Sequence, residues 1–330
     1  MSPRIESTKL FISHIEDIDN MSQSKDRDII LALIVGIMLI TVVVLGVLAF
    51  APLDPFSSGE DWSYQGSVPL ESLDLSIEAD VCDVDVAFGD LDGDLVKVEM
   101  NIEGKSGYLV GEPDINYTVT SSLNAGKLSV VVVLDMNTGP TVTYDESDIV
   151  VTVDRSLPAF LAIEVDVGDV VITVPEGSYL MGAAVHADVG KLHLNLEDGA
   201  ETGDLDLRSD VGSVKVECTN AIFAEGTLVK AETGTGSIHL DLDMSSSQNG
   251  NVTFECLANV GSVNLALMIA GDASAEITSQ ANVGEIKTDL VGFSGMDVHL
   301  LSDNHPDVWN VELFLEADVG SVYIDAEWGE

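Results

Sequence analysis

An Asp/Asn-Val-Gly motif recurs along the C-terminal half of the chain and constrains its fold more than any other feature. Its clearest copy is Ser209-Asp210-Val211-Gly212, and successive motif glycines are 22, 22, 24, 25, 23 and 36 residues apart. Such a period is typical of stacked repeats, in which one unit cannot bury its apolar face alone. Because the last interval is longer by about half a repeat, we expect an insertion near residues 302–310. The glycines are at positions 168, 190, 212, 236, 261, 284 and 320.

The residues around each glycine alternate between apolar and polar. Before Gly212, apolar or small residues at 205, 207, 209 and 211 alternate with charged ones, and Val214, Val216 and Cys218 continue the pattern after it. This period of two predicts strands on both sides of a corner, with one face inward. We therefore predict an all-β fold, a parallel β-solenoid with coils of 22–25 residues. Each glycine is expected about 4.8 Å from its neighbour in the next coil.

The corner motif has a conformational explanation. Asp or Asn can bond the backbone two residues on, and glycine supplies the positive φ of a sharp turn. Aspartate and asparagine exchange at this position, as Asn259 and Asn282 show. A short acceptor oxygen is all that the corner requires, so we expect a turn-capping role.

The charge of the chain excludes several classes of partner. Among 330 residues there are 57 acidic and 13 basic ones, for a formal net charge of −44, and all but 6 of the acids follow residue 28. Binding nucleic acid through a basic face is excluded, as is docking onto an anionic membrane surface. The content of 46% apolar residues in regular alternation argues against disorder.

Residues 29–51 form an uncharged apolar stretch long enough to span a bilayer as a helix. Lys25 and Arg27 precede it, and the next basic residue after it is Lys97. The positive-inside rule then places the N-terminus in the cytoplasm and the rest of the chain outside. A cleaved signal peptide ending at Ala51 is the alternative, but the apolar run exceeds the usual signal core of about 7–15 residues.

The chain divides accordingly into five parts. Residues 1–28 are a cytoplasmic segment, 29–51 a transmembrane helix and 52–66 a linker with proline, serine and glycine. Residues 67–154 are expected to form irregular N-terminal coils that cap the solenoid, as terminal repeats must. Residues 155–330 are expected to form its regular coils.

Parts of the chain resemble the putative-adhesin β-solenoid families of prokaryotic envelopes. The resemblance lies in the runs 73–84, 151–158 and 163–170 and in the later copies of the last run. These families are relatives of the head-GIN and toast-rack domains. The resemblance covers residues 67–330 and implies an extracytoplasmic, parallel-stranded solenoid. It brings no functional residues with it. Cys82 and Gly234 depart from the corner pattern at the glycine and aspartate positions.

One set of carboxylates could hold a metal ion. Asp166, Asp188 and Asp210 would stack in consecutive coils, where like charges repel by about 1 kcal/mol per neighbouring pair in water. Calcium accepts several carboxylate oxygens at flexible geometry and would relieve this repulsion. The competing interpretation is three turn caps with solvated charges. No other cofactor is expected.

Other reactive residues have simpler interpretations. Cys82, Cys218 and Cys256 are odd in number, so a full disulfide framework is excluded, and we expect buried thiols. His193 and His239 share one outward row but lie two coils apart, too far to share a zinc ion. Glycosylation sequons begin at Asn116 and Asn251.

The sequence thus predicts a membrane-anchored extracytoplasmic protein that acts without catalysis in binding, adhesion or envelope scaffolding. Its partner would be a protein or glycan of the cell surface. Serine, cysteine and histidine form no nucleophile motif, and aromatic residues amount to only 5%. Two alternatives remain: an envelope polysaccharide-active enzyme on the same scaffold, and a scaffold that polymerises end to end through self-association.

Overall fold

The computed structural model describes residues 37–38, 53–66, 70–107, 113–136, 142–245, 250–271, 273–306 and 309–329. The chain divides into two units, and the unit of Pro55–Ser106 and Glu112–Glu330 contains nearly all of the strands. Its regular elements are strands, so the predicted all-β class is confirmed. The predicted membrane helix 29–51 lies outside the described residues except for Ile37 and Met38. No helix within the described residues is long and apolar enough to cross a membrane.

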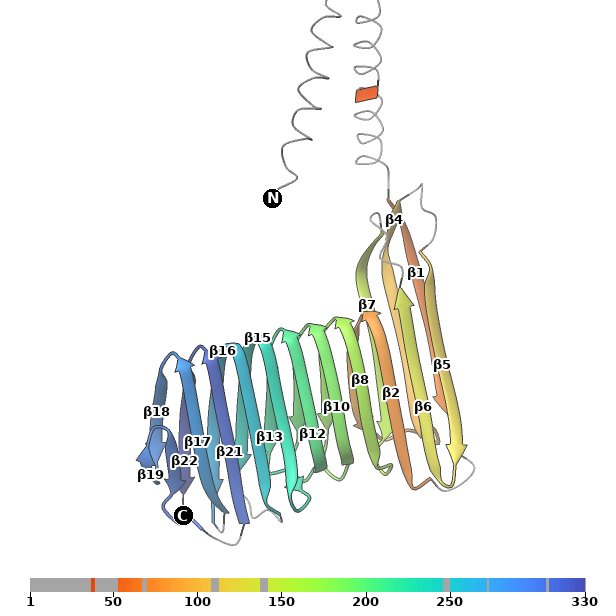
Figure 1. Cartoon of the computed structure of the whole chain (residues 1–330). Helices are drawn as coiled ribbons and strands as arrows, with labels where there is room; N and C mark the ends of the chain where they lie inside the picture. Colours follow the sequence, from red (N-terminus) through yellow and green to blue (C-terminus); the bar gives the residue numbers. More distant parts are fainter. Residues whose placement is uncertain are drawn as a thin grey trace, which may run out of the picture. The chain divides into compact units, whose positions relative to one another are not determined.

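The strands that precede the corners form the first ladder, in which neighbours pair parallel and in register. Its spatial order is β6, β2, β8, β10, β12, β15, β16, β21 and β17 (Figure 1). These strands are β2 (Ser72–Val81), β6 (Lys127–Met136), β8 (Ala159–Val167), β10 (Tyr179–Val189), β12 (Glu201–Val211), β15 (Thr227–Met244), β16 (Val252–Ala270), β17 (Ala273–Val283) and β21 (Trp309–Val319).

The strands that follow the corners form the second ladder, again parallel and in register. Strands β15 and β16 are long enough to pass through the corner, and their second halves belong to this ladder. From the N-terminal end up to β15, the other members are β7 (Val142–Asp154), β3 (Asp83–Gly89), β9 (Val170–Val174), β11 (Leu192–Leu196) and β13 (Val214–Thr219). Beyond β16 follow β22 (Val322–Gly329) and then β18 (Ile286–Val291).

Antiparallel strands lie at both ends of the ladders. At the N-terminal end, β5 pairs with β6, β4 pairs with β7 and β1 pairs with β4. At the C-terminal end, the hairpin β19–β20 pairs with β17. Among the described strands, none pairs with the outer edge of β18. The bounds are β1 (Leu53–Tyr64), β4 (Val96–Gly107), β5 (Ile115–Asn124), β19 (Phe293–Met296) and β20 (His299–Ser302), and the short β14 (Ile222–Phe223) pairs with β12.

The stacking order departs from the chain order at both ends. The last coil, β21 with β22, lies between the coil of β16 and the coil of β17 and β18 (Figure 1). The expected position of Gly284 next to Gly261 is therefore wrong, because Gly320 separates them. Near the N-terminus, β2 similarly separates β6 from β8. The extra residues of the last interval include the hairpin β19–β20 (293–302), which precedes most of the expected range 302–310.

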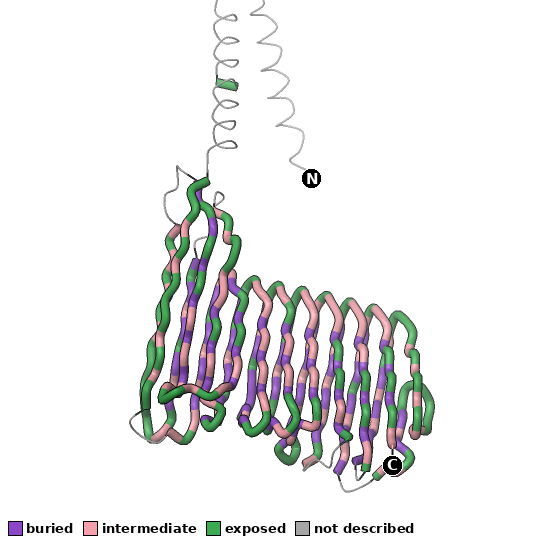
Figure 2. Tube along the Cα trace, turned by 180° about the vertical axis from the view of Figure 1, so that it is seen from behind, coloured by how far each residue is buried: buried purple, intermediate pink, exposed green. Residues whose placement is uncertain are grey.

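The inward residues of the two ladders pack into one hydrophobic core. Buried and partly exposed residues alternate along the strands, as the sequence predicts (Figure 2). Cys82, Cys218 and Cys256 are buried free thiols, also as expected. Val211, expected to point inward, is instead 50% exposed. The chain bends around Gly212, so the side chain just before the glycine emerges on the outside of the corner.

The corners are held by contacts that the motif does not suggest. The hydroxyls of Ser209 and Thr233 donate to the carbonyls of the preceding glycines, Gly190 and Gly212, at 2.9 and 3.1 Å. Within the described residues, Asp166, Asp188 and Asp210 make no hydrogen bond to the backbone of their corners. The predicted capping role of these three is therefore wrong. Near the N-terminal end, capping comes from the residues that follow Cys82 and Gly168: the carboxylates of Asp83 and Asp169 accept hydrogen bonds from the backbone amides of Asp169 and Lys191, at 2.7 and 2.8 Å.

Replacing a stacked corner glycine should destabilise the whole fold. A Cβ on Gly320 would overlap the carbonyl oxygen of Gly261, and its φ is 156°. We expect Gly320→Ala to lower the free energy of unfolding by about 3 kcal/mol or more. The matched control is Gly226→Ala, which has φ 77° but open space around it. It should cost about 1 kcal/mol. Equal losses in urea unfolding would show that the corners do not stack by backbone contact.

Candidate functional site

The outward face of the first ladder contains a groove of about 600 Å³. Each strand of the ladder presents outward residues in rows, because successive side chains alternate between faces. Three of these outward positions carry short residues, Ala162, Ala184 and Gly234, which leave a depression between longer neighbours. Ionisable residues from β2, β8, β10, β12 and β15 surround it, among them Glu78, Glu164, His186, Arg208, Asp210 and Glu232.

Arg208 is held within the groove by acidic partners. Its guanidinium donates two hydrogen bonds to Asp206, at 2.8 and 2.9 Å, and lies 3.7 Å from Glu232. The hydrogen bond and charge of Asp206 raise the pKa of Arg208 above its ordinary value. This planar, two-bond contact fixes the orientation of the guanidinium. The groove therefore presents a fixed cation inside a ring of carboxylates.

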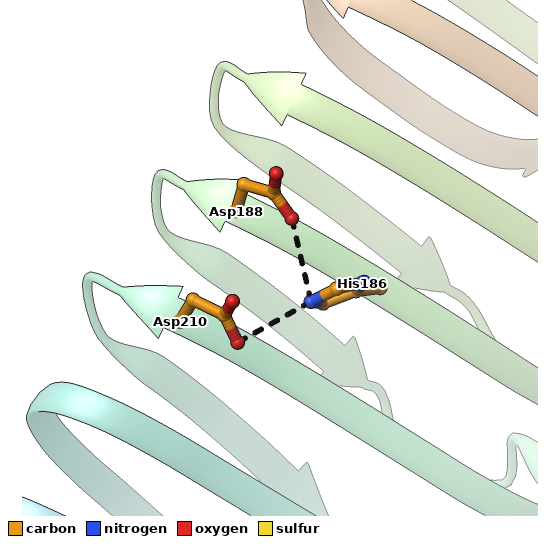
Figure 3. A group of neighbouring side chains, drawn as sticks. All are labelled: His186, Asp188 and Asp210. Carbon is orange, nitrogen blue, oxygen red and sulfur yellow. Dashed lines mark hydrogen bonds and ion pairs between the residues drawn. The ribbon is translucent and has the colours of Figure 1, made fainter.

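His186 lines the groove and lies between two carboxylates (Figure 3). Its Nε2 is 3.6 Å from Asp188 Oδ1 and 3.5 Å from Asp210 Oδ1. His186 and Asp188 are two residues apart on β10 and so share a face. Asp210 comes from β12, whose register places it beside Asp188. One donor atom from each residue lies within 4.8 Å of the other two.

The predicted calcium set is only partly brought together. Asp166, Asp188 and Asp210 occupy the outward face of the neighbouring strands β8, β10 and β12, as the repeat implies. The metal-ligand group, however, consists of His186, Asp188 and Asp210, without Asp166. Sequence reasoning missed His186, although its place two residues before Asp188 puts it on the same face. Calcium binding by the three aspartates remains a prediction.

The two histidines considered in the sequence lie on the second ladder, apart from this site. His193 and His239 are separated by Lys215 in the strand between them. The imidazole of His193 contacts the carboxylate of Glu217. Hydrogen bonds, led by that from Lys215, lower the pKa of Glu217. This arrangement is an ordinary charged surface and offers no shared metal site.

The two predicted glycosylation positions differ in their surroundings. Asn116 is exposed on β5. Asn251 is also exposed, but its side-chain amide donates to Glu225 Oε1 at 2.9 Å and its Oδ1 accepts from the backbone of Asn310 at 2.7 Å. A glycan on Asn251 would attach to the nitrogen that makes the first of these contacts. Asn116 is therefore the more accessible acceptor.

The thiols are unsuited to nucleophilic chemistry. Burial raises the pKa of Cys82 to about 12 and that of Cys218 to about 12. Burial also raises the pKa of Cys256. A thiol, unlike a thiolate, is a poor nucleophile and a poor metal ligand. Their role is that of small apolar core residues.

A second groove of about 340 Å³ continues on the same face across β16, β21 and β17. It shares Glu232 and Leu257 with the first groove. Its wall includes the ring of Phe314, which is 44% exposed, beside Gln280 and Glu316. The outward face of the first ladder is thus recessed along much of the stack.

No family model and no curated protein matches this chain. A solved structure described as a putative adhesin from Bacteroides fragilis is 15% identical, with a TM-score of 0.40, over 82% of this chain and 97% of its own. A putative cell adhesion protein from Clostridium sporogenes is 13% identical, with a TM-score of 0.39, over 82% of this chain and 100% of its own. A putative adhesin from Parabacteroides distasonis is 10% identical, with a TM-score of 0.34, over 82% and 98%. The predicted resemblance to such proteins is confirmed. At these scores no function is carried over from them.

Proposed function

We propose that this chain is a parallel β-solenoid, anchored by residues 29–51 and exposed outside the cytoplasm, that binds or organises components of the cell envelope. The observation that carries the proposal is the long recessed face of the first ladder, on which the two grooves lie in line. In-register hydrogen-bonded strands hold this face rigidly, so it can bind without reorganising. Its acidic surroundings favour a partner with cationic or hydrogen-bond-donating groups.

A non-catalytic role is supported by the placement of the reactive groups. Glycoside hydrolysis needs two carboxyl groups across a cleft, one of them with a raised pKa. Burial raises the pKa of Asp85, and burial followed by Glu146 raises that of Asp148. Neither residue lines either groove. The polysaccharide-active alternative therefore gains no support from these groups.

The proposed topology can be tested with an added surface cysteine. We expect Glu176→Cys, in an exposed turn, to react with a membrane-impermeant maleimide on intact cells. The unsubstituted chain should not react, because its thiols are buried. As matched control, Ser22→Cys should react only after lysis. Labelling of Ser22→Cys on intact cells, or of Glu176→Cys only after lysis, would overturn the proposed orientation.

End-to-end assembly is a second candidate, favoured by the unpaired edge of β18. Ile286 and Leu290 are half-buried there, whereas Val322 and Ala326, their register partners on β22, are buried. An exposed strand edge is a template for pairing with another chain. A second copy would pair with this edge and cover these residues.

Sedimentation velocity of the full-length chain in detergent tests this assembly. We expect larger species at rising concentration, favoured by salt, because screening weakens repulsion between chains of charge −44. Val291→Lys, 57% exposed at the end of β18, should abolish them. Val260, 48% exposed at a corner, provides the matched control: Val260→Lys should leave the larger species unchanged. A single species at every concentration and salt would exclude the scaffold.

A further inference from the structure

The contacts within the group His186, Asp188 and Asp210 are long for charge-assisted hydrogen bonds. A charge-assisted hydrogen bond between imidazole and carboxylate is about 2.7–2.9 Å long. The Nε2 to Oδ1 distances here are 3.6 and 3.5 Å, at the long limit for such a bond. Ligands about 2.0–2.1 Å from a tetrahedral zinc ion lie about 3.3 Å from one another. The three ligand atoms lie within 4.8 Å of one another, close enough to share one metal ion.

We propose that His186, Asp188 and Asp210 bind a divalent transition metal ion of the zinc class. The imidazole decides the class of metal: nitrogen suits zinc, copper or nickel, whereas calcium takes six to eight oxygen ligands. Two carboxylates and a neutral imidazole also match the charge of one divalent ion. This inference goes beyond the proposed binding role, and neither depends on the other.

The surroundings of the group favour a cation. Arg208, the register partner of His186, is the nearest fixed cation in the neighbouring strand. Its guanidinium is bonded to Asp206 and lies near Glu232, so its charge is already compensated. On the other side, Glu164 is the register partner of His186 and adds a further negative charge.

The site is accessible and has an open side. The side chains of His186, Asp188 and Asp210 are 39%, 55% and 71% exposed. His186 and Asp210 also line the larger groove. A fourth ligand, water or a donor atom of a bound partner, would enter from this groove, as in zinc sites that keep an open position.

Two further histidines of the described residues, His299 and His305, provide a comparison. At the C-terminal end, His299 Nε2 is 2.9 Å from Glu276 Oε1, a distance typical of a closed hydrogen bond. His305 Nε2 is 4.0 Å from the other oxygen of Glu276. The imidazole of His299 is already hydrogen-bonded, and that of His305 is farther from Glu276. The group of His299, His305 and Glu276 should therefore bind metal more weakly than the group of His186 does.

Titration calorimetry of the full-length chain in detergent, with zinc chloride at constant ionic strength, tests the proposal. We expect one site that is weakened at least tenfold by His186→Ala and by Asp210→Asn. Asp166→Asn and His299→Ala should bind zinc as the unsubstituted chain does. Calcium chloride should not compete. Because metal ligands must be deprotonated to bind, zinc affinity should fall in acid.

A spectroscopic readout distinguishes the site from zinc held loosely by other carboxylates. Bound cobalt(II) should give a visible absorption band of tetrahedral coordination that disappears in His186→Ala. Circular dichroism of each variant checks the fold, which these exposed substitutions should leave intact. Three results would overturn the proposal: no zinc binding, zinc binding unchanged by His186→Ala, or equal losses in Asp166→Asn and Asp210→Asn.

Discussion

Backbone contact between corner glycines is the constraint on which the rest of this structure depends. A Cβ on Gly212, Gly236 or Gly261 would overlap the carbonyl oxygen of the glycine in the adjacent coil. The corners therefore stack without side chains between them, at the spacing of neighbouring strands. This contact aligns both ladders at once, so that residues a fixed number of positions from the glycine form straight rows. The groove and the group around His186 are consequences of these rows, since each gathers side chains from adjacent coils.

The same constraint explains why the coils need not stack in chain order. The corners at Gly261, Gly284 and Gly320 present equivalent surfaces to their neighbours, so the coil of β21 and β22 fits between those of β16 and β17. The hairpin β19–β20 then pairs with β17 at the C-terminal end of the first ladder. Antiparallel β4 and β5 play the corresponding part at the other end. Such caps protect strand edges that would otherwise pair with other chains.

The sequence predicted what depends on local pattern and missed what depends on neighbours in space. Alternation correctly placed Leu207 and Val216 in the core. It failed at Val211, because the alternation between inward and outward side chains ends where the chain bends. The order of the last coils was not predictable, since the motifs that end in Gly261, Gly284 and Gly320 are nearly the same.

The candidate site shows the same division. The repeat placed Asp188 and Asp210 side by side on the outer face. It gave no reason to single out His186, whose register partners in the two neighbouring strands are Glu164 and Arg208. The turn-capping role assigned to the aspartates followed from local chemistry. The structure instead ties the corners through hydroxyls one position earlier, such as that of Ser209, which donate to the adjacent coil.

Disulfide trapping tests the stack and its order most directly. Ala266 and Asp325 are exposed register partners on β16 and β22, whereas Asp289 on β18 lies one strand further away. Neighbouring strands about 4.8 Å apart fall within disulfide range, and strands twice as far apart do not. Mild oxidation should therefore cross-link cysteines at 266 and 325 and leave a pair at 266 and 289 reduced. A bond between 266 and 289, with none between 266 and 325, would contradict the structure.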